Sequence, residues 1–412
     1  MELRDRHLGP IASEVMGTFP AMMLLGARQV GKSTLTHLLD LPQARYMTLD
    51  DTATLNSALE DPVGFITSSG TETLVIDELQ RCPELLLEIK ASIDRDRRPG
   101  RFLLTCSADL LRLERTPDSL AGRAILMNLE GFSQGELCRK QDDFITHLET
   151  VGPGYSKNSA LGRPDYAELL VRGGFPEVQD LSVRSRRLWF SSYMSQIVQR
   201  DARDTIATNQ PERLASILDV IAATQGGELV KSHLASQAEL PASTANLYLD
   251  ALQRLYMIYL LPPWTNNSLK RVTGKPKAGI RDVGLASHLL GTTSERLASM
   301  TSPHIGGLLE SFVVTELMKQ QGWSESDFTL GHYRDSLGSE IDIIVEMSDE
   351  SVWGIEVKAT QTLRTDHFKH LKKLKERLGD RCRGGIVLSL YPQNVGMGPS
   401  FWGMPVSALW EH

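Results

Sequence analysis

The sequence has few features of secreted, membrane-spanning or disulfide-rich proteins. Its cysteines are few and scattered, and they match no metal-binding spacing: Cys82, Cys106, Cys138 and Cys382. No apolar run approaches the roughly 20 residues that cross a bilayer. The N-terminal stretch MELRDRHLGP lacks the apolar segment of a signal peptide. We therefore expect a protein of the reducing cytoplasm, without a membrane partner.

An excess of positive charge is also missing. The formal net charge is −7 at pH 7, so any contact with nucleic acid must come from local basic patches. A chain of 412 residues is too long for one hydrophobic core, and its composition is that of an ordinary globular protein. We expect roughly two to four domains.

Residues 26–33 read GARQVGKS and fit the pattern G-x-x-x-x-G-K-[ST] of a phosphate-binding loop. Gly26 and Gly31 let the backbone curve around phosphate oxygens. Lys32 would reach the β- and γ-phosphates, and the hydroxyl of Ser33 would ligate Mg²⁺. An apolar run precedes the loop and leucines at helical spacing follow it. The order strand, loop, helix is the one that this chemistry needs.

A second motif, TLVIDE at residues 73–78, is an apolar strand that ends in two carboxylates. Asp77 would hold Mg²⁺, directly or through water, and Glu78 would polarise the attacking water as general base. An isolated acidic pair after a strand would only cap the next helix. The phosphate loop upstream favours the catalytic interpretation, which predicts hydrolysis of ATP as well as binding.

Strands and helices alternate from residue 1 to about residue 131, which predicts an open parallel sheet with helices on both faces. Strands are expected at 22–25, 45–49, 74–77, 102–106 and 125–129, and a helix at 83–94. Thr105 and Ser107, where the fourth strand ends, are candidates for sensing the γ-phosphate; ordinary strand-end polarity is an equal alternative. The residues expected to bind ATP are Gly26, Ala27, Arg28, Gln29, Val30, Gly31, Lys32, Ser33, Thr34, Asp77 and Ser107.

Arg123, just before the fifth strand, has two interpretations. It is a candidate arginine finger for a nucleotide in its own or a neighbouring subunit. It is equally a structural arginine that pairs with a carboxylate. A finger acting between subunits would require a homo-oligomer, which we expect.

The middle of the chain is mostly helical. Helices are expected at 166–172 and 183–207. The arginines of the second helix are expected on a solvated face, and contact with DNA is the alternative. They are Arg184, Arg186, Arg187, Arg200 and Arg203. Three helices and a β-ribbon over 211–275 then indicate a winged-helix arrangement. The front of its third helix carries Ser243, Thr244 and Asn246 and no Arg or Lys, so sequence-specific reading is not expected. Structural docking and non-specific DNA contact both remain open.

The last third of the chain carries a second group of carboxylates. Asp342 lies near the start of one predicted strand, and Glu356 and Lys358 share a face of the next because strand side chains alternate. A hairpin would place Asp342 beside them, and Glu310 on a preceding helix is a further carboxylate. Such a group would hold Mg²⁺ through Glu310, Asp342 and Glu356 and orient a water for phosphodiester attack. A basic helix over 364–377 would lie along a phosphate backbone or form a charged solvent face.

The motifs GARQVGKS, VIDELQ, TCSADLL, LAGRA and GSEIDII…IEVKAT occur in an order that resembles a large prokaryotic family. Its members are AAA-type P-loop ATPases fused to a C-terminal PD-(D/E)xK nuclease-like domain. The resemblance implies that Lys32, Ser33, Asp77 and Glu78 serve the ATP site. It also implies that Asp342, Glu356 and Lys358 occupy nuclease positions, with Glu310 as the helix carboxylate.

These observations predict a multidomain α/β protein. The expected domains are an ATPase domain over 1–135, a helical linker over 136–210, a winged-helix-like domain over 211–275 and a nuclease-like domain over 276–412. The expected function is ATP hydrolysis acting on DNA, with a Mg²⁺-dependent nuclease-like C-terminal domain. One alternative is an ATP-dependent switch whose C-terminal domain binds a protein or DNA without catalysis, and another is an ATP-dependent transcription regulator.

Overall fold

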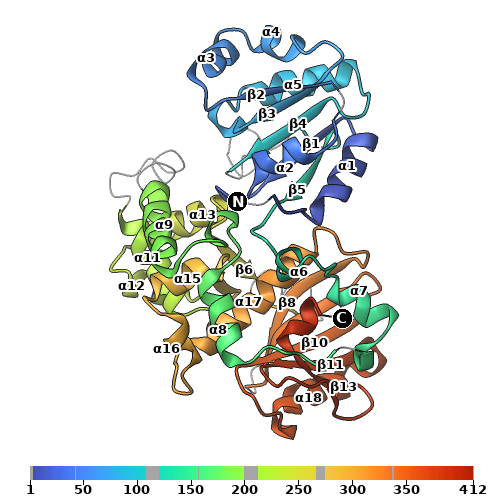
Figure 1. The fold of residues 1–412 in the computed structure, drawn as a ribbon, viewed down its shortest axis with the longest axis vertical. Helices are drawn as coiled ribbons and strands as arrows, with labels where there is room; N and C mark the ends of the chain where they lie inside the picture. The colour runs from blue at the N-terminus through green and yellow to red at the C-terminus, as the bar shows by residue number, and fades with distance from the viewer. Residues whose placement is uncertain are drawn as a thin grey trace. The chain divides into compact units, whose positions relative to one another are not determined.

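The alternation of strands and helices in the sequence becomes two α/β units in the computed structural model (Figure 1). The structure describes residues 3–41, 43–107, 120–155, 157–198, 212–265, 274–335 and 338–411. One unit comprises residues 1–132 with 254–256, and the other comprises residues 133–253 with 257–412. The multidomain α/β class expected from the sequence is confirmed.

The first unit is built on a five-stranded parallel sheet with the strand order β2-β3-β4-β1-β5. Its strands are β1 (Ala21–Leu25), β2 (Ala44–Thr48), β3 (Thr73–Asp77), β4 (Phe102–Cys106) and β5 (Ala124–Asn128). Every residue of β1 and β4 is buried, as expected for central strands covered on both faces, whereas the edge strands β2 and β5 are partly exposed. The sheet places the ends of β1, β3 and β4 side by side.

Two helices of the first unit begin at an aspartate whose side chain caps them. The helices of this unit are α1 (Leu8–Thr18), α2 (Lys32–Leu38), α3 (Thr52–Glu60), α4 (Pro62–Thr67) and α5 (Leu85–Arg95), with a short 3-10 turn, η1 (Leu79–Arg81). The carboxylate of Asp51 caps α3, and that of Asp61 caps α4, whose first residue is a proline. The predicted strands and the helix over 83–94 agree with the structure to within two residues.

The second unit begins with helices. They are α6 (Gln134–Cys138), α7 (Phe144–Thr150), α8 (Arg163–Arg172), α9 (Val183–Gln196), α11 (Glu212–Ala223), α12 (Lys231–Gln237), α13 (Ala242–Arg254), α15 (Val283–Leu289) and α16 (Ser294–Ala298). A two-stranded antiparallel ribbon of β6 (Ile258–Leu261) and β7 (Lys277–Ile280) follows α13. Three helices and a ribbon are thus present, while their use as a winged helix stays a prediction. The end of the predicted helix over 183–207, with Arg200 and Arg203, lies outside the described residues.

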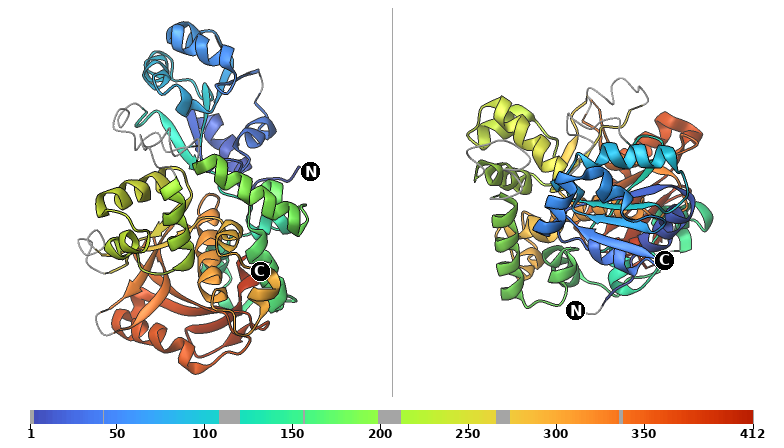
Figure 2. Two further views of the ribbon diagram at one scale, coloured as in Figure 1. Left: turned by 90° about the vertical axis from the view of Figure 1, so that its left-hand side faces the viewer. Right: turned by 90° about the horizontal axis from the view of Figure 1, so that it is seen from above.

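A six-stranded mixed sheet forms the C-terminal part of the second unit (Figure 2), with the order β12-β13-β11-β10-β9-β8. Its strands are β8 (Phe328–Arg334), β9 (Glu340–Met347), β10 (Val352–Lys358), β11 (Cys382–Ser389), β12 (Val395–Gly396) and β13 (Phe401–Pro405). Strand β9 pairs antiparallel with both β8 and β10, and β10, β11 and β13 run parallel. The predicted hairpin that carries Asp342 and Glu356 is therefore present as β9 and β10.

Two helices pack on this sheet, α17 (Ile305–Gln320) against β10 and α18 (Lys369–Leu378) against β9, β10 and β11. Helix α17 is buried on most of its circumference, whereas α18 buries chiefly Leu371 and Leu374. Gly385 on β11 lets α18 approach closely, because a Cβ there would lie 2.8 Å from the Cβ of Leu371. Among the described residues, no helix is both long and apolar enough to cross a membrane.

Candidate functional site

The phosphate loop connects β1 to α2 at the carboxyl end of the parallel sheet. Gly26 has a φ of 152°, and a Cβ at this position would lie 2.1 Å from the carbonyl oxygen of Leu129. Gly31 has a φ of 97° and immediately precedes α2. Only glycine fits both positions without strain, which is the physical reason for the two glycines in the motif.

A buried arginine that the motif does not include supports the loop from behind. Arg6 is 8% exposed and donates hydrogen bonds to the carbonyl oxygens of Val30 (2.9 Å) and Glu130 (2.7 Å). Its guanidinium group also lies 4.8 Å from the ring centroid of Phe132, a cation–π contact. Sequence reasoning missed this role, because Arg6 lies 24 residues before Val30 and no local pattern links the two.

Lys32 places its ammonium group at the centre of the loop. The side chain is 5% exposed, and Nζ donates to the carbonyl oxygens of Gly26 (2.9 Å) and Ala27 (2.8 Å). Burial lowers the pKa of Lys32, although the carboxylates of Glu78 and Asp77 act in the opposite direction. A buried cation without a carboxylate in direct contact is suited to a phosphate group.

Ser33 and Asp77 meet beside Lys32. The Ser33 hydroxyl lies 3.0 Å from both carboxylate oxygens of Asp77, which also accepts a hydrogen bond from the Thr105 hydroxyl. A hydroxyl and a carboxylate next to a phosphate site are the hard oxygen ligands that Mg²⁺ prefers. The residues present therefore fit the metal that a P-loop ATPase uses, and Ser33 and Asp77 would hold it.

Glu78 follows Asp77 in an uncommon backbone conformation, with φ 60° and ψ 45°. For a residue other than glycine, the left-handed region costs about 1–3 kcal/mol and is concentrated at functional sites. The Ser107 hydroxyl and the Gln80 amide both donate to its carboxylate, and its own N–H donates to the Thr105 hydroxyl (3.1 Å). Gln80 also donates to the Ser107 hydroxyl (2.8 Å). Both sensor candidates thus contact the acidic pair, and Gln80 is a contact that sequence reasoning missed.

Arg123 lies away from this group. It directly precedes β5, whose first residue pairs with the first residue of β1, while the phosphate loop follows the last residue of β1. Its guanidinium forms a two-point ion pair with Asp94 of α5, with distances of 2.8 and 2.9 Å. Arg123 thus pairs with a carboxylate at the amino ends of the strands, as in the structural interpretation, whereas the phosphate loop lies at their carboxyl ends. Its use as an arginine finger stays a prediction.

The C-terminal hairpin brings together three of the residues predicted from the second group. The carboxylate of Asp342 on β9 accepts a hydrogen bond from the backbone N–H of Val357 (2.8 Å). Lys358 Nζ lies 2.5 Å from Glu356 Oε2 and 3.5 Å from Asp342 Oδ2. The expected constellation of two carboxylates and a lysine is formed.

A second lysine, which sequence reasoning missed, occupies the space between these carboxylates and Glu310. Lys277 on β7 is 2% exposed. Its Nζ lies 2.7 Å from Glu310 Oε1, 3.0 Å from Glu340 Oε1 and 3.5 Å from Asp342 Oδ1. We call Lys277, Glu310, Glu340, Asp342, Glu356 and Lys358 the buried ion cluster. The only sequence signal for Lys277 is a lysine at the start of a short apolar strand, which does not reveal its partners.

Burial dominates the protonation of the cluster. Desolvation raises the pKa of Glu310 to about 8, and the charge of Asp342 adds to this effect. Desolvation likewise raises the pKa of Glu356 to about 8, despite its ion pair with Lys358. Burial opposes ionisation of Asp342 too, but the ammonium groups of Lys358 and Lys277 outweigh it and lower the pKa.

The buried ion cluster does not fit the Mg²⁺ expected there. Glu310, Asp342 and Glu356 were predicted as metal ligands, but Lys277 already donates to Glu310 and ion-pairs with Asp342, and Lys358 pairs with Glu356. Within the described ranges, no group of three or more Asp, Glu, His or Cys side chains is arranged to hold a metal ion. The carboxylates are neutralised by lysines, so no chemical step is derived through a metal at this place.

Comparison with known proteins divides the chain in three. Residues 18–138 match a family described as an AAA domain, and residues 163–296 and 305–409 match the domains of unknown function DUF8612 and DUF4143. The uncharacterized proteins Mb2031c of Mycobacterium bovis and Rv2008c of Mycobacterium tuberculosis are each 30% identical over 348 residues, which is 83% of this chain and 71% of theirs. Among solved structures, the Walker-type ATPase PABY2304 of Pyrococcus abyssi is 14% identical with a TM-score of 0.44, covering 70% of this chain and 96% of that chain.

Proposed function

Because the chain belongs to the family of the mycobacterial proteins Mb2031c and Rv2008c and contains an AAA domain, we propose that its first unit binds ATP with Mg²⁺ and hydrolyses it. One observation carries this proposal. Lys32, Ser33, Asp77 and Glu78 come from two separate loops of the sheet and converge beside the phosphate loop, with the Ser33 hydroxyl 3.0 Å from the Asp77 carboxylate.

Each residue has a distinct part in this reaction. The loop amides and Lys32 would bind the phosphates, and Ser33 and Asp77 would hold Mg²⁺, which would supply positive charge to neutralise the phosphates. Glu78 accepts the proton of the attacking water as general base. Ser107 and Gln80 donate to the Glu78 carboxylate and fix its orientation, while Thr105 holds Asp77. The strained backbone at Glu78 is maintained by these contacts.

The test is steady-state release of phosphate from ATP with Mg²⁺, combined with binding of a fluorescent ATP analogue. Lys32→Ala should lose binding and turnover together, whereas Glu78→Gln should keep binding and lose turnover by about 100-fold or more. Arg95→Gln, at the exposed C-terminal end of α5 and outside the phosphate loop, is the matched control. Turnover by Glu78→Gln equal to that of the wild type would remove Glu78 as the base.

For the second unit, we propose the non-catalytic alternative rather than the nuclease. The support is the buried ion cluster, in which Lys277 and Lys358 pair with the carboxylates that metal-dependent cleavage would need free. ATP turnover in the first unit would then serve a switch. Incubation of the protein with linear and branched DNA, ATP and Mg²⁺ tests this directly. Cleavage that disappears in Asp342→Ala and Glu356→Ala would restore the nuclease.

DNA is the partner that we propose for this switch, because α18 presents a row of exposed lysines. Lys369, Lys372 and Lys373 are exposed, and none of them forms an ion pair within the described part of the chain. Lysines on one helix face can contact successive phosphates without reading bases. Mobility shift over a salt series tests the contact, since a triple Lys→Gln variant should bind more weakly and with a shallower salt slope. Equal binding by the variant would exclude α18 as the DNA surface.

A further inference from the structure

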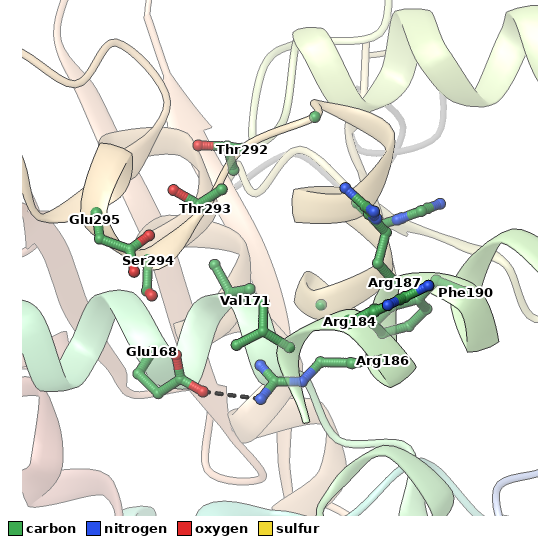
Figure 3. A pocket seen from close by; sticks show the side chains of 14 residues that line it. Glu168, Val171, Arg184, Arg186, Arg187, Phe190, Thr292, Thr293, Ser294 and Glu295 are labelled. Atoms are coloured by element: carbon green, nitrogen blue, oxygen red, sulfur yellow. Dashed lines mark hydrogen bonds and ion pairs between the residues drawn. The ribbon is translucent and has the colours of Figure 1, made fainter. Parts of the chain in front are cut away.

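The segment matching DUF8612 contains a cavity of about 570 Å³ that neither the ATP site nor the buried ion cluster uses. It lies between α8, α9, α15 and the loop that leads into α16 (Figure 3), all of them within the second unit. Ligand pockets typically have volumes of about 300–1,000 Å³. The cavity is therefore large enough for a small metabolite.

One wall of the cavity carries three arginines of α9: Arg184, Arg186 and Arg187. The sequence indicated a solvated face for all three, but Arg186 is buried, with 5% of its surface exposed. Its Nη2 donates to Glu168 Oε1 at 3.0 Å, whereas its Nε and Nη1 are buried and have no hydrogen-bond partner among the described residues. Buried donors in native structures are almost always paired, so two unpaired ones on one guanidinium indicate a missing acceptor.

The neighbouring arginines extend the positive charge toward solvent. Arg184 and Arg187 are exposed, and neither guanidinium forms an ion pair within the described ranges. Arginine presents a planar fork of donors that matches the oxygens of a phosphate group. A phosphoryl group beside Arg186 would accept the unpaired N–H groups and face two further cations.

The opposite wall supplies hydroxyl and carboxylate groups, and the floor is apolar. Residues 292–294 contribute three hydroxyls, and Figure 3 shows them across the cavity from the arginines, with Val171 between. Phe190 adds an aromatic surface. The three arginines outnumber the two lining carboxylates, those of Glu168 and Glu295, so the lining carries a formal net charge of +1. The lining thus combines an anion-binding wall, an apolar patch and acceptors for hydroxyl groups.

We propose that this cavity binds a small phosphorylated metabolite whose phosphoryl group contacts Arg186 and whose remaining part packs on Val171 and Phe190. The site is independent of the proposed ATP hydrolysis, because all its lining residues belong to the second unit. An acidic peptide segment would satisfy the arginines but would leave the enclosed apolar patch unused. The metabolite is therefore the occupant that the cavity favours.

The test measures binding by calorimetry to the full chain carrying Lys32→Ala, which disables the phosphate loop. The probes are inorganic phosphate and adenosine 5′-monophosphate, with adenosine and tetraglutamate as comparators. We expect adenosine 5′-monophosphate to bind at one site, at least about tenfold more tightly than adenosine, because charge-assisted hydrogen bonds are lost without the phosphoryl group.

The double variant Arg184→Gln with Arg187→Gln keeps the buried contact between Arg186 and Glu168. It should bind phosphate and adenosine 5′-monophosphate about tenfold or more weakly than the protein without these changes. Lys231→Gln with Lys275→Gln removes two exposed charges elsewhere in the same unit and should leave binding of both phosphorylated probes unchanged. Arg186→Met should abolish binding in protein whose circular dichroism spectrum is unchanged. The proposal is overturned if neither phosphorylated probe binds below about 1 mM, if the Arg184/Arg187 pair has no effect, or if tetraglutamate binds as tightly as the phosphorylated probes.

Discussion

Replacing Lys277 by methionine is the sharpest perturbation of the buried ion cluster. Methionine keeps most of the length of the side chain and removes only the ammonium group, which contacts Glu310, Glu340 and Asp342 at 2.7–3.5 Å. Removing one partner of a buried ion pair costs about 3–5 kcal/mol, because the remaining charge is left unpaired. Burial raises the pKa of Glu310, which reduces the charge that is left unpaired when the ammonium group is removed. We therefore expect Lys277→Met to lower the free energy of unfolding by about 3 kcal/mol, at the lower end of this range.

Urea unfolding at pH 7 measures the loss in the free energy of unfolding of the second unit. Repeating it with Mg²⁺ tests whether this loss comes from the unpaired carboxylates. Without its ammonium group, the cluster presents carboxylates that can bind a divalent cation, so Mg²⁺ should restore part of the stability of Lys277→Met. At ten times its dissociation constant, the gain is about 1.4 kcal/mol. The wild type should not respond. Lys372→Met on the exposed face of α18 is the matched control and should resemble the wild type.

The double variant Lys277→Met with Glu310→Gln separates charge from packing. It should recover much of the lost stability, because a neutral amide replaces the carboxyl that Lys277 contacts most closely. The reasoning is refuted if Lys277→Met unfolds at the same urea concentration as the wild type and ignores Mg²⁺. Such a result would mean that the lysine is not the counter-ion of the cluster.

Three further outcomes follow from particular contacts. The pKa of Glu356 is about 8 in the folded state and 4.5 in the unfolded chain, so the folded state holds an extra proton between these pH values. The free energy of unfolding therefore falls as the pH rises from about 4.5 to about 8. Glu356→Gln should reduce this fall when the urea midpoints at pH 5 and pH 8 are compared. Arg6→Met should weaken ATP-analogue binding at least about tenfold in a fluorescence titration, because the carbonyls that hold the loop lose charged donors. Arg123→Gln should leave the urea midpoint and phosphate release nearly unchanged, since its ion pair with Asp94 is solvent-accessible. Abolished turnover would instead show a finger acting between subunits.

The sequence was sufficient to predict that the residues of the proposed ATP site meet, because they are local to two short motifs. Gly26, Gly31 and the strand ending at Asp77 are recognisable from spacing alone, and the order of strands in a parallel sheet then places the motifs together. The β9–β10 hairpin was predictable for the same reason, since its strands are neighbours in the chain.

The features that sequence reasoning missed depend on contacts between distant residues. Lys277 contacts carboxylates that lie at least 33 residues later in the chain, on α17 and β9. No sequence pattern around position 277 indicates these contacts. Arg186 was assigned to a solvated face by its charge, although Phe190 and Tyr193 continue its spacing as a buried helical stripe. The helical spacing of Arg186, Phe190 and Tyr193 predicts that Arg186 is buried, whereas the charge of its side chain alone predicts a solvated position.

The most direct measurement of the proposed ATP hydrolysis is the identity of the nucleotide that Glu78→Gln retains. The variant is incubated with radiolabelled ATP and Mg²⁺, separated from free nucleotide and denatured, and the released nucleotide is analysed. Since Lys32, Ser33 and Asp77 are intact and the general base is absent, the recovered nucleotide should be ATP, whereas the wild type should yield ADP. Recovery of ADP from Glu78→Gln at the wild-type rate would contradict the assignment of Glu78, and recovery of no nucleotide from either protein would contradict the ATP site itself.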